Sequence, residues 1–348
     1  MTTLTEKIWR GFLISDLFHV KIGKAIDGNK VDRTSGHYPY VTRKESNNGV
    51  DGFIDYDESF LNKDVPCITV GNETAQPFVQ KVPFFTGTKV NILSPKKKIS
   101  YLTLQFIATS LKMHKSKYSY AFTINSTRLK NQKIMLPVND KGEPDYNFME
   151  NYVRVVEEKQ LQRYRDYVQA LDAAKIPPLN EKIWRPFFIS DLFRLETGKS
   201  KGLNHLEDDE QGISYLGATN RNNGVLTFVK PVENLIQRGN CIAFIRNGEG
   251  SIGYSIYKRE DFIATSDITC GYADFLNEFV GLFITTVADK VRGKYNFNYK
   301  RSDTRLKREK LMLPINDDGA PDFEYMEAYV KNSMAAQYRK YLEYLGDD

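Results

Sequence analysis

The sequence Glu6-Lys-Ile-Trp-Arg-Gly-Phe-Leu-Ile-Ser-Asp-Leu-Phe18 returns later in the chain as Glu181-Lys-Ile-Trp-Arg-Pro-Phe-Phe-Ile-Ser-Asp-Leu-Phe193. Over positions 6–24 and 181–199 the two stretches share 13 identical residues in 19. Self-similarity of this extent indicates that one structural unit has been duplicated. The offset of 175 residues is too long, and two copies are too few, for a solenoid. The sequence therefore predicts two related domains.

The repeat continues through the rest of each copy. Asn47-Asn-Gly-Val50 matches Asn222-Asn-Gly-Val225 at the same offset. Thr127-Arg-Leu-Lys130 matches Thr304-Arg-Leu-Lys307 at an offset of 177. A tandem duplication therefore accounts for essentially the whole chain.

Each copy combines short strands with helices. Stretches rich in β-branched and aromatic residues alternate with Asn-Gly, Gly-Asn and Pro-Gly turns, which predicts strands at hairpin spacing. The Ser-Asp pair of each repeated opening is expected to cap a short helix at the Leu-Phe that follows. We expect an α+β fold in which a strand-rich domain is followed by a long helix, twice. The expected boundaries are 1–145 and 176–322 for the domains and 146–175 and 323–348 for the helices.

Both long helices carry a single apolar stripe, with members three or four residues apart. Such a stripe is typical of a helix that pairs with another helix, and a glutamine buried midway along it would fix the register of the pair. The alternative is that each stripe packs on its own domain. The expected interface residues are Val153, Val156, Gln160, Tyr164 and Val168 in the first helix and Val330, Gln337, Tyr341 and Leu345 in the second.

The composition is that of a globular protein. Of 348 residues, 41% are hydrophobic and 27% are charged, and the net charge of +5 permits nucleic-acid binding without requiring it. No apolar stretch approaches the ~20 residues that span a bilayer. The N-terminus lacks a signal pattern, and the three cysteines are too scattered for a disulfide framework. We therefore expect a cytoplasmic protein with no membrane contact.

No motif for a reaction centre is present in the sequence. It contains no Walker loop, no nucleotide-binding glycine fingerprint after a strand and no nucleophile elbow, and its four histidines have no partner at metal-ligand spacing. The expectation is a chain with binding surfaces, no catalytic residues and no metal site. A stand-alone metal-dependent nuclease and a duplicated protein-binding adaptor remain as alternatives.

The chain resembles the specificity subunits of restriction–modification systems, both of type I and of the BcgI-like type IIB systems. The resemblance is carried by the repeated Trp-Arg-x-Phe-x-Ile-Ser-Asp-Leu-Phe opening, by Asn247-Gly-Glu-Gly-Ser-Ile-Gly-Tyr254, and by the Arg-Leu-Lys, Met-Leu-Pro and Met-Glu order that leads into each long helix. The approach to the long helix is more similar to the BcgI-like branch. The first copy departs at Gly71-Asn-Glu-Thr-Ala-Gln-Pro77, so the two tips are not expected to read the same bases.

The resemblance implies that each copy is a target-recognition domain and that together they read an asymmetric bipartite site in double-stranded DNA. It implies that the long helices pair antiparallel as a spacer. Methyltransferase subunits, or fused methyltransferase–endonuclease subunits, would dock on this chain, and S-adenosylmethionine and Mg²⁺ would belong to those partners. A helix of ~25 residues rises about 37 Å. This is close to one DNA turn of ~34–36 Å, which predicts half-sites centred about one turn apart.

The candidate DNA contacts are basic and small polar residues in predicted turns and in basic stretches that contain aromatic residues. Those at the divergent tips (Asn72, Gln76, Arg246 and Asn247) are the expected base readers. Asn-Asn-Gly is also ordinary turn chemistry, and Trp9 and Trp184 are expected to pack inside the protein. The candidates in the first copy are Lys24, Arg43, Asn47, Asn48, Asn72, Gln76, Lys117, Tyr118 and Arg128. Those in the second copy are Lys199, Arg221, Asn222, Asn223, Arg246, Asn247, Lys294, Tyr295, Lys300, Arg301 and Arg305.

Overall fold

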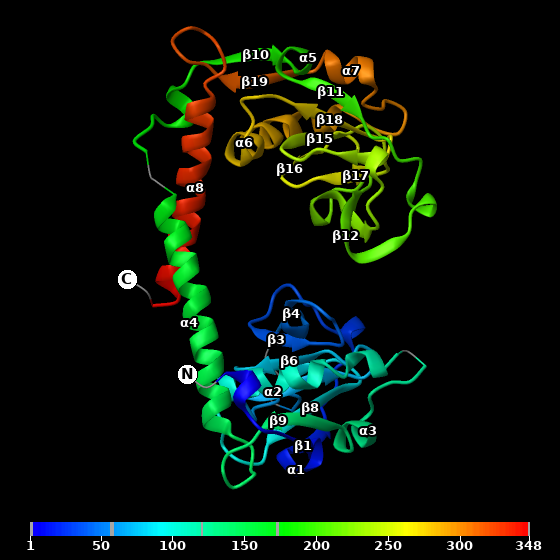
Figure 1. Cartoon of the computed structure of the whole chain (residues 1–348), viewed down its shortest axis with the longest axis vertical. Coiled ribbons are helices and arrows are strands. Elements are labelled where there is room, and N and C mark those ends of the chain that lie inside the picture. The colour runs from blue at the N-terminus through cyan, green and yellow to red at the C-terminus, as the bar shows by residue number, and fades with distance from the viewer. Residues whose placement is uncertain (1–2, 56–58, 120, 172–173, 347–348) are drawn as a thin grey trace. The chain divides into compact units, whose positions relative to one another are not determined.

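The computed structural model describes residues 3–55, 59–119, 121–171 and 174–346 (Figure 1). The chain divides into two compact units, unit 1 over Met1–Arg163 and unit 2 over Tyr164–Asp348. The division falls within the long helix α4 (Tyr146–Ala170). Met149 in this helix is fully buried in the core of unit 1, so the first turns of α4 fold with the domain that precedes them.

Unit 1 begins with the repeated opening and ends in α4. Its other helices are α1 (Ile14–Leu17), α2 (Tyr101–Lys112) and α3 (Ser126–Lys130). Its strands are β1 (Trp9–Leu13), β2 (Phe18–Ile22), β3 (Tyr38–Val41), β4 (Val50–Ile54), β5 (Cys67–Gly71), β6 (Pro77–Gln80), β7 (Phe85–Thr86), β8 (Val90–Pro95) and β9 (Lys133–Pro137).

The described residues of unit 1 form three small sheets. An antiparallel pair has the order β1-β9, a four-stranded antiparallel sheet has the order β2-β8-β5-β6, and a three-stranded sheet has the order β4-β3-β7 with β3 and β7 parallel. The apolar face of α2 packs on the four-stranded sheet, where Ile68, Leu104 and Ile107 are fully buried in one cluster. Ser100 is the N-cap of α2, and its side chain accepts a hydrogen bond from the Thr103 amide.

Unit 2 repeats this plan. Its helices are α5 (Ile189–Leu192), α6 (Glu278–Ala288), α7 (Asp303–Lys307) and α8 (Phe323–Tyr344). Its strands are β10 (Trp184–Phe188), β11 (Arg194–Thr197), β12 (Asp208–Leu216), β13 (Val225–Val229), β14 (Ile236–Gln237), β15 (Cys241–Ile245), β16 (Ser255–Lys258), β17 (Phe262–Ala264), β18 (Ile268–Tyr272) and β19 (Lys310–Pro314).

The sheets of unit 2 correspond to those of unit 1 strand by strand. Their orders are β10-β19, β11-β18-β15-β16 and β13-β12-β17-β14. The last sheet gains β14, which pairs antiparallel with β17. The α+β fold and its duplication, expected from the sequence, are thus present in the structure.

The repeated opening folds as strand, single helical turn and strand. β1 pairs antiparallel with β9, with Trp9 opposite Pro137, and β10 pairs in the same way with β19. The expected cap was wrong: Ser15 and Asp16 lie inside α1, whose N-cap is Leu13 without a side-chain cap. The helical turn therefore depends on the two flanking strands rather than on capping.

Both tryptophans pack inside their own unit, as expected. Trp9 stacks on Phe106 with ring centroids 6.1 Å apart, and its indole N–H donates to the Leu4 carbonyl at 3.1 Å. Trp184 stacks on Phe283 at 6.1 Å and donates to the Leu179 carbonyl at 3.2 Å. Each tryptophan thus joins the start of its copy to a helix of the same unit, α2 for Trp9 and α6 for Trp184.

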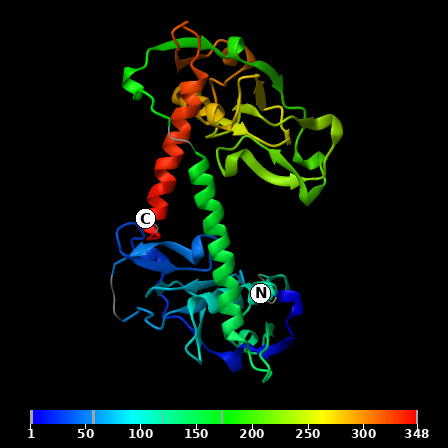
Figure 2. The same ribbon diagram turned by 60° about the vertical axis from the view of Figure 1, so that its left-hand side comes forward.

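Within unit 2, the end of α4 contacts α8 (Figure 2). The Tyr164 ring lies 5.5 Å from the rings of both Tyr338 and Tyr341, at angles of 63° and 83°. Further along, Asn332 Nδ2 donates to the Ala174 carbonyl at 2.8 Å. Tyr164 thus contacts the later part of α8, and Ala174 contacts its earlier part. The two segments are therefore antiparallel. Val168, in the same segment, is 4% exposed.

The other residues predicted for the helix interface either pack on their own unit or are exposed. Val153 and Val330 pack against the cores of their own units. Gln160 and Gln337 are exposed, so the expectation that they are buried and fix the register was wrong. The physical reason is that each apolar stripe first serves its own domain. Two other predicted members are 42% and 44% exposed, namely Val156 and Leu345.

Candidate nucleic-acid interface

Each copy presents two stacked aromatic rings and one arginine, which we term the aromatic–arginine stack. In unit 1 the Tyr118 and Phe122 rings lie 6.0 Å apart at 6°, and the Arg128 guanidinium lies 4.0 Å from the Phe122 centroid. Arg128 Nη1 also donates to the Thr123 carbonyl at 2.6 Å. The Phe122 side chain is 49% exposed. The guanidinium is thus held in place beside an exposed ring.

The stack in unit 2 uses the same positions, 177 residues later. The Tyr295 and Tyr299 rings lie 6.1 Å apart at 14°, and the Arg305 guanidinium lies 3.9 Å from the Tyr299 centroid. Arg305 Nη1 donates to the Lys300 carbonyl at 2.7 Å. Lys300 Nζ lies 5.3 Å from the centroid of Phe297, which is 74% exposed.

The chemistry of both stacks suits a nucleic-acid backbone. A guanidinium has five N–H donors in a planar fork and binds phosphate well, while an exposed ring offers a face to a base or sugar. Exposed lysines precede the two stacks at positions 117 and 294. Because both copies keep the stack, it fits the sequence-independent part of DNA binding.

In the tip of unit 1, residues 72–76 between β5 and β6, the first residue, Asn72, is held by neutral polar groups. The Asn72 amide donates to the Lys89 carbonyl at 3.0 Å, and its carbonyl accepts from the Ile124 amide at 2.9 Å. Asn72 Oδ1 accepts from Asn91 Nδ2 at 2.6 Å, and Asn91 Oδ1 accepts from Ser126 Oγ at 2.6 Å. The predicted base reader Asn72 is thus fixed on β8 and α3.

The second residue of the same tip, Glu73, is the centre of a charged cluster. Arg43 Nη1 is 2.7 Å from Glu73 Oε2, and Lys89 Nζ is 3.1 Å from Glu73 Oε1. Burial opposes the charge on Glu73, but the hydrogen bonds from Arg43 and Lys89 outweigh it and lower the pKa of this carboxyl. A cavity of about 700 Å³ adjoins the cluster and offers donors and acceptors of the kind that read base edges. Its charged lining residues are Asp27, Arg33, Arg43, Lys44, Asp51 and Glu73.

In the tip of unit 2, residues 246–254 between β15 and β16, the first residue, Arg246, is held by an ion pair. Arg246 Nη1 lies 2.9 Å from Asp303 Oδ1, and Arg246 Nη2 donates to the Ser266 carbonyl. The Arg246 side chain is 16% exposed. Asn247 Nδ2 donates to Asp267 Oδ1 at 3.0 Å.

The two tips therefore place different chemistry on one scaffold. Asn72 and Ser126 of unit 1 stand where unit 2 has Arg246 and Asp303. The turn has five residues in unit 1 (72–76) and nine in unit 2 (246–254). A conserved frame with divergent tips is what two readers of different sequences require.

The Asn-Asn-Gly segments form turns, as their alternative interpretation predicts. Asn47 and Asn48 have φ values of 51° and 53°, and Asn48 Nδ2 donates to the Val79 carbonyl at 3.1 Å. The second copy repeats the turn, with φ of 49° at Asn222 and 52° at Asn223. A turn role accounts for these four asparagines.

Three predicted phosphate contacts lie on the surface. Lys24 Nζ donates to the Ser59 carbonyl at 2.9 Å, and Lys199 Nζ donates to the Ile236 carbonyl at 3.4 Å. Both lysines are exposed, as is Arg221 in the turn of unit 2. Their positions are compatible with backbone contacts to DNA, which stay a prediction.

Two predicted DNA contacts, Gln76 and Arg301, are buried, so these two predictions were wrong. Gln76 is 8% exposed, and its Nε2 donates to the Pro77 carbonyl at 3.3 Å. Arg301 is 0% exposed, because its guanidinium is paired inside unit 2. Neither side chain reaches the surface.

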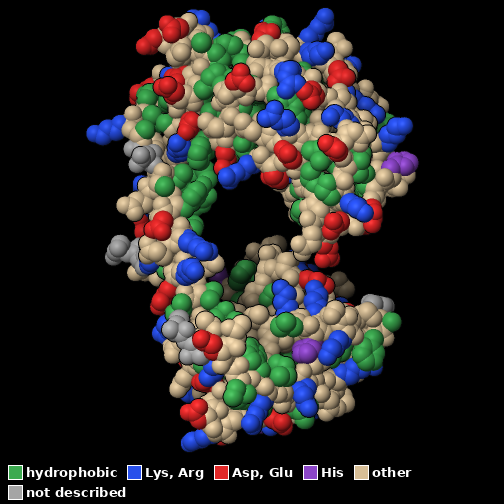
Figure 3. All heavy atoms as spheres, in the orientation of Figure 1, with side chains coloured by type: hydrophobic (Ala, Val, Ile, Leu, Met, Phe, Trp, Pro, Cys, Tyr) green, Lys and Arg blue, Asp and Glu red, His purple; other side chains and the backbone are tan. Residues whose placement is uncertain are grey.

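Cationic side chains are dispersed over the face in Figure 3, with acidic ones among them. This pattern agrees with the small net charge of +5. Across the residues that the structure describes, no group of three or more His, Cys, Asp and Glu side chains could hold a metal ion. In the same residues, no helix has the length and apolar character needed to cross a membrane.

Comparisons with known proteins also indicate DNA recognition. The family model described as "Type I restriction modification DNA specificity domain" matches twice, over residues 6–163 and 181–343. The chain belongs to this family. The specificity subunit S.BcgI of a type II restriction enzyme, from Heyndrickxia coagulans, is 36% identical over 324 residues, which cover 92% of each chain. The crystal structure of the S subunit of a type I restriction–modification system from M. genitalium has a TM-score of 0.54 at 15% identity and covers 99% of this chain and 95% of that one.

The protein is accordingly a DNA sequence-specificity subunit of a restriction–modification system, and not an enzyme in its own right. Such subunits bind DNA and assemble with methyltransferase or restriction subunits. The sequence-based preference for the BcgI-like branch agrees with the similarity to S.BcgI.

Several residues that organise this specificity subunit were missed in the sequence. Asn91 and Asp303 hold the two tips, and Glu73 within the first tip pairs with two cations. Asn91 and Glu73 lie in segments where the copies differ, so the repeat gives no signal for them. Asp303 was detectable, because it immediately precedes the repeated Thr-Arg-Leu-Lys sequence.

Proposed function

We propose that this specificity subunit reads an asymmetric bipartite site in double-stranded DNA, one half with each copy. The observation that supports this most directly is the pair of matching sheets with unlike tips: five residues after β5 in unit 1 and nine after β15 in unit 2. One scaffold with two reading surfaces suits two different half-sites. The recognition domains are assigned to 1–145 and 176–322.

The long helices, assigned to 146–175 and 323–348, act as the spacer between the readers. α4 has 25 residues and α8 has 22. At 1.5 Å per residue the longer helix spans about 37 Å, which is close to one turn of DNA. Half-sites centred about one turn apart follow from this length.

The chemistry is carried out by partner chains. Methyltransferase subunits, or fused methyltransferase–endonuclease subunits, dock on this subunit in the cytoplasm and are directed by it to the site. S-adenosylmethionine and Mg²⁺ are bound by those partners. The subunit itself supplies base readout from its tips and phosphate contacts from its aromatic–arginine stacks, Lys24 and Lys199.

The test is binding to DNA libraries in which each half-site and the gap are randomised, with the full chain alone and with its methyltransferase. We expect salt-sensitive binding that selects two short sequences separated by an unspecified gap. Selection of one continuous sequence, or binding without sequence preference, would contradict the proposal. DNA cleavage by the purified chain with Mg²⁺ alone would favour the nuclease alternative, and partner binding without DNA binding would favour the adaptor.

A further inference from the structure

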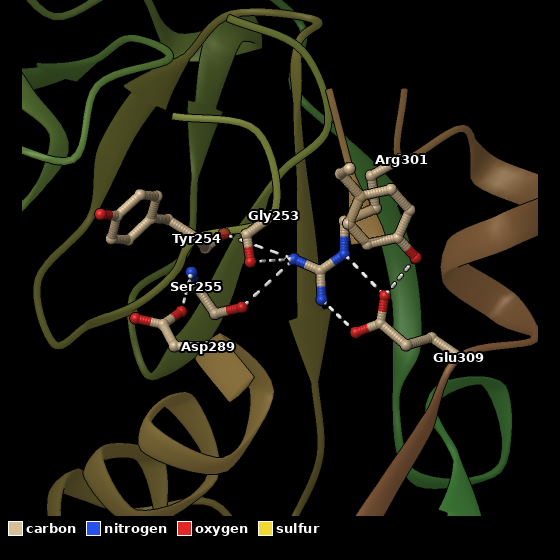
Figure 4. Close-up of polar contacts among 7 residues, drawn as sticks. Gly253, Tyr254, Ser255, Asp289, Arg301 and Glu309 are labelled. Carbon is tan, nitrogen blue, oxygen red and sulfur yellow. Dashed lines mark hydrogen bonds and ion pairs between the residues drawn. The ribbon is translucent and has the colours of Figure 1, made fainter. Parts of the chain in front are cut away.

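Arg301 is the largest fully buried side chain that the structure describes, and its charge is completely paired. Its Nε donates to Glu309 Oε2 at 3.0 Å and its Nη2 donates to Glu309 Oε1 (Figure 4). The Tyr295 hydroxyl donates to the same Oε2 at 2.6 Å. The Phe244 ring centroid lies 5.0 Å from the guanidinium carbon.

The other side of the guanidinium faces the loop between β15 and β16. Nη1 lies within hydrogen-bond distance of three acceptors, the carbonyls of Gly253 and Tyr254 at 3.2 and 3.4 Å and Ser255 Oγ at 3.3 Å. Asp289 Oδ1 accepts from the Ser255 amide at 2.9 Å. The end of the 246–254 loop is therefore held by two charged side chains, which lie on either side of it in Figure 4.

Unit 1 lacks this arrangement. The positions of Arg301 and Glu309 are taken there by Ile124 and Gln132, and only the tyrosine is kept. The Tyr118 hydroxyl donates to Gln132 Oε1 at 2.8 Å. The ion pair thus occurs in the copy whose tip is four residues longer, nine residues against five.

We propose that Arg301 is a positioning residue for base recognition: it fixes the 246–254 loop and so determines which bases the second copy accepts. This rests on the proposed function. A buried ion pair contributes little stability relative to apolar replacements of similar size. What this pair does provide is a fixed link, because one guanidinium bonds both to Glu309 and to the carbonyl of Gly253 in the loop. The planar fork of arginine meets Glu309 and the loop together, whereas a lysine ammonium offers no such fork.

The experiment compares discrimination at the two half-sites. The full chain with its methyltransferase is titrated with the preferred DNA and with single-base changes in each half. Two variants are used: Arg301→Ile with Glu309→Gln, which installs the unit 1 residues, and Arg301→Lys. We expect the ratio of matched to mismatched affinity at the second half-site to fall at least tenfold in both variants, with the first half-site unchanged.

A purely structural role would give a different result. Both variants would then lose thermal stability or active fraction while keeping the wild-type ratio at the second half-site, and that result overturns the proposal. If the double variant does not fold, Arg301→Lys decides, since it keeps a charge opposite Glu309. Arg339→Ile, an exposed change on α8, is the control and should alter neither ratio. A wild-type chain without sequence preference would instead contradict the proposed function.

Discussion

Lys7 Nζ lies 2.7 Å from Asp145 Oδ2, which ties the repeated opening of unit 1 to the start of α4. Asp145 Oδ1 also accepts from the Phe148 amide at 3.0 Å, so one carboxylate serves both as helix cap and as ion-pair partner. Burial opposes its charge, but these two interactions lower the pKa of Asp145. Unit 2 repeats the pair as Lys182 and Asp322, also at 2.7 Å.

Asp145→Ala should destabilise unit 1 more than Asp145→Asn does. The asparagine can still accept the Phe148 amide and loses only the ion pair, whereas alanine loses both, and a cap contributes about 1 kcal/mol. Urea unfolding in a Trp184→Phe background, where Trp9 reports unit 1, measures the difference. Equal losses for the two variants would show that the cap adds nothing.

The lowered pKa of Glu73 predicts that this carboxylate stabilises the fold near neutral pH and that the stabilisation is lost in acid. Its pKa is lowered below 4.5 in the folded chain, so its stabilisation is complete above 4.5 and is lost as the pH falls through the lowered pKa. The gap in unfolding free energy between wild type and Glu73→Gln should therefore shrink between about pH 6 and about pH 3. Denaturant titrations at several pH values measure it, with the exposed Glu249→Gln as control. A difference in unfolding free energy that stays constant over this pH range would show that the Glu73 carboxylate does not cause any pH dependence of stability.

The contact between Tyr164 and Tyr341 should be energetically coupled. Edge-to-face aromatic pairs contribute about 0.5–1.5 kcal/mol beyond their buried area. A double-mutant cycle with Tyr164→Ala and Tyr341→Ala, followed by the unfolding of unit 2, should return a coupling in that range. Strictly additive effects would mean that the rings only lie near each other.

Gln160→Leu and Gln337→Leu should be nearly neutral. Both glutamines are exposed, and exposed substitutions usually change the free energy of unfolding by less than about 0.5 kcal/mol. Chemical denaturation of each variant tests this. A stabilisation well above that limit would restore the interpretation of a buried polar pair that fixes helix register.

Arg128→Ala and Arg305→Ala should weaken DNA binding without changing its specificity. If each arginine contacts a phosphate, each loss lowers affinity equally for matched and mismatched DNA and reduces the slope of log affinity against log salt by about 1. Fluorescence anisotropy over a salt series measures both quantities. Lys130→Ala and Lys307→Ala are the matched controls, because these exposed lysines occupy equivalent positions in α3 and α7. A selective loss for one sequence would indicate base readout instead.

Local sequence patterns predicted the elements that depend on local chemistry. The Asn-Asn-Gly turns favoured by their residue types are present at Asn47–Gly49 and Asn222–Gly224. The strands expected from β-branched and aromatic stretches are present in both copies. β1 was missed because its partner, β9, begins at Lys133, so a distant pairing decides its conformation. Arg301 was misplaced because a basic residue among tyrosines has the composition of a nucleic-acid surface. Its burial depends on Glu309, and nothing local in the sequence distinguishes that pairing.

The 246–254 loop of unit 2 is held at both ends, next to β15 and β16, and is exposed at Gly250 in between. Gly250 has φ of 71°, and apart from its two chain neighbours no described residue has an atom within 4 Å of where a Cβ would stand. Substitutions that suit a positive φ, such as asparagine, would therefore meet no steric barrier there. A protein built in this way can acquire a new recognition sequence through changes at the apex, leaving its fold and its assembly unaltered. Natural selection could thus diversify the targets of such systems one half at a time.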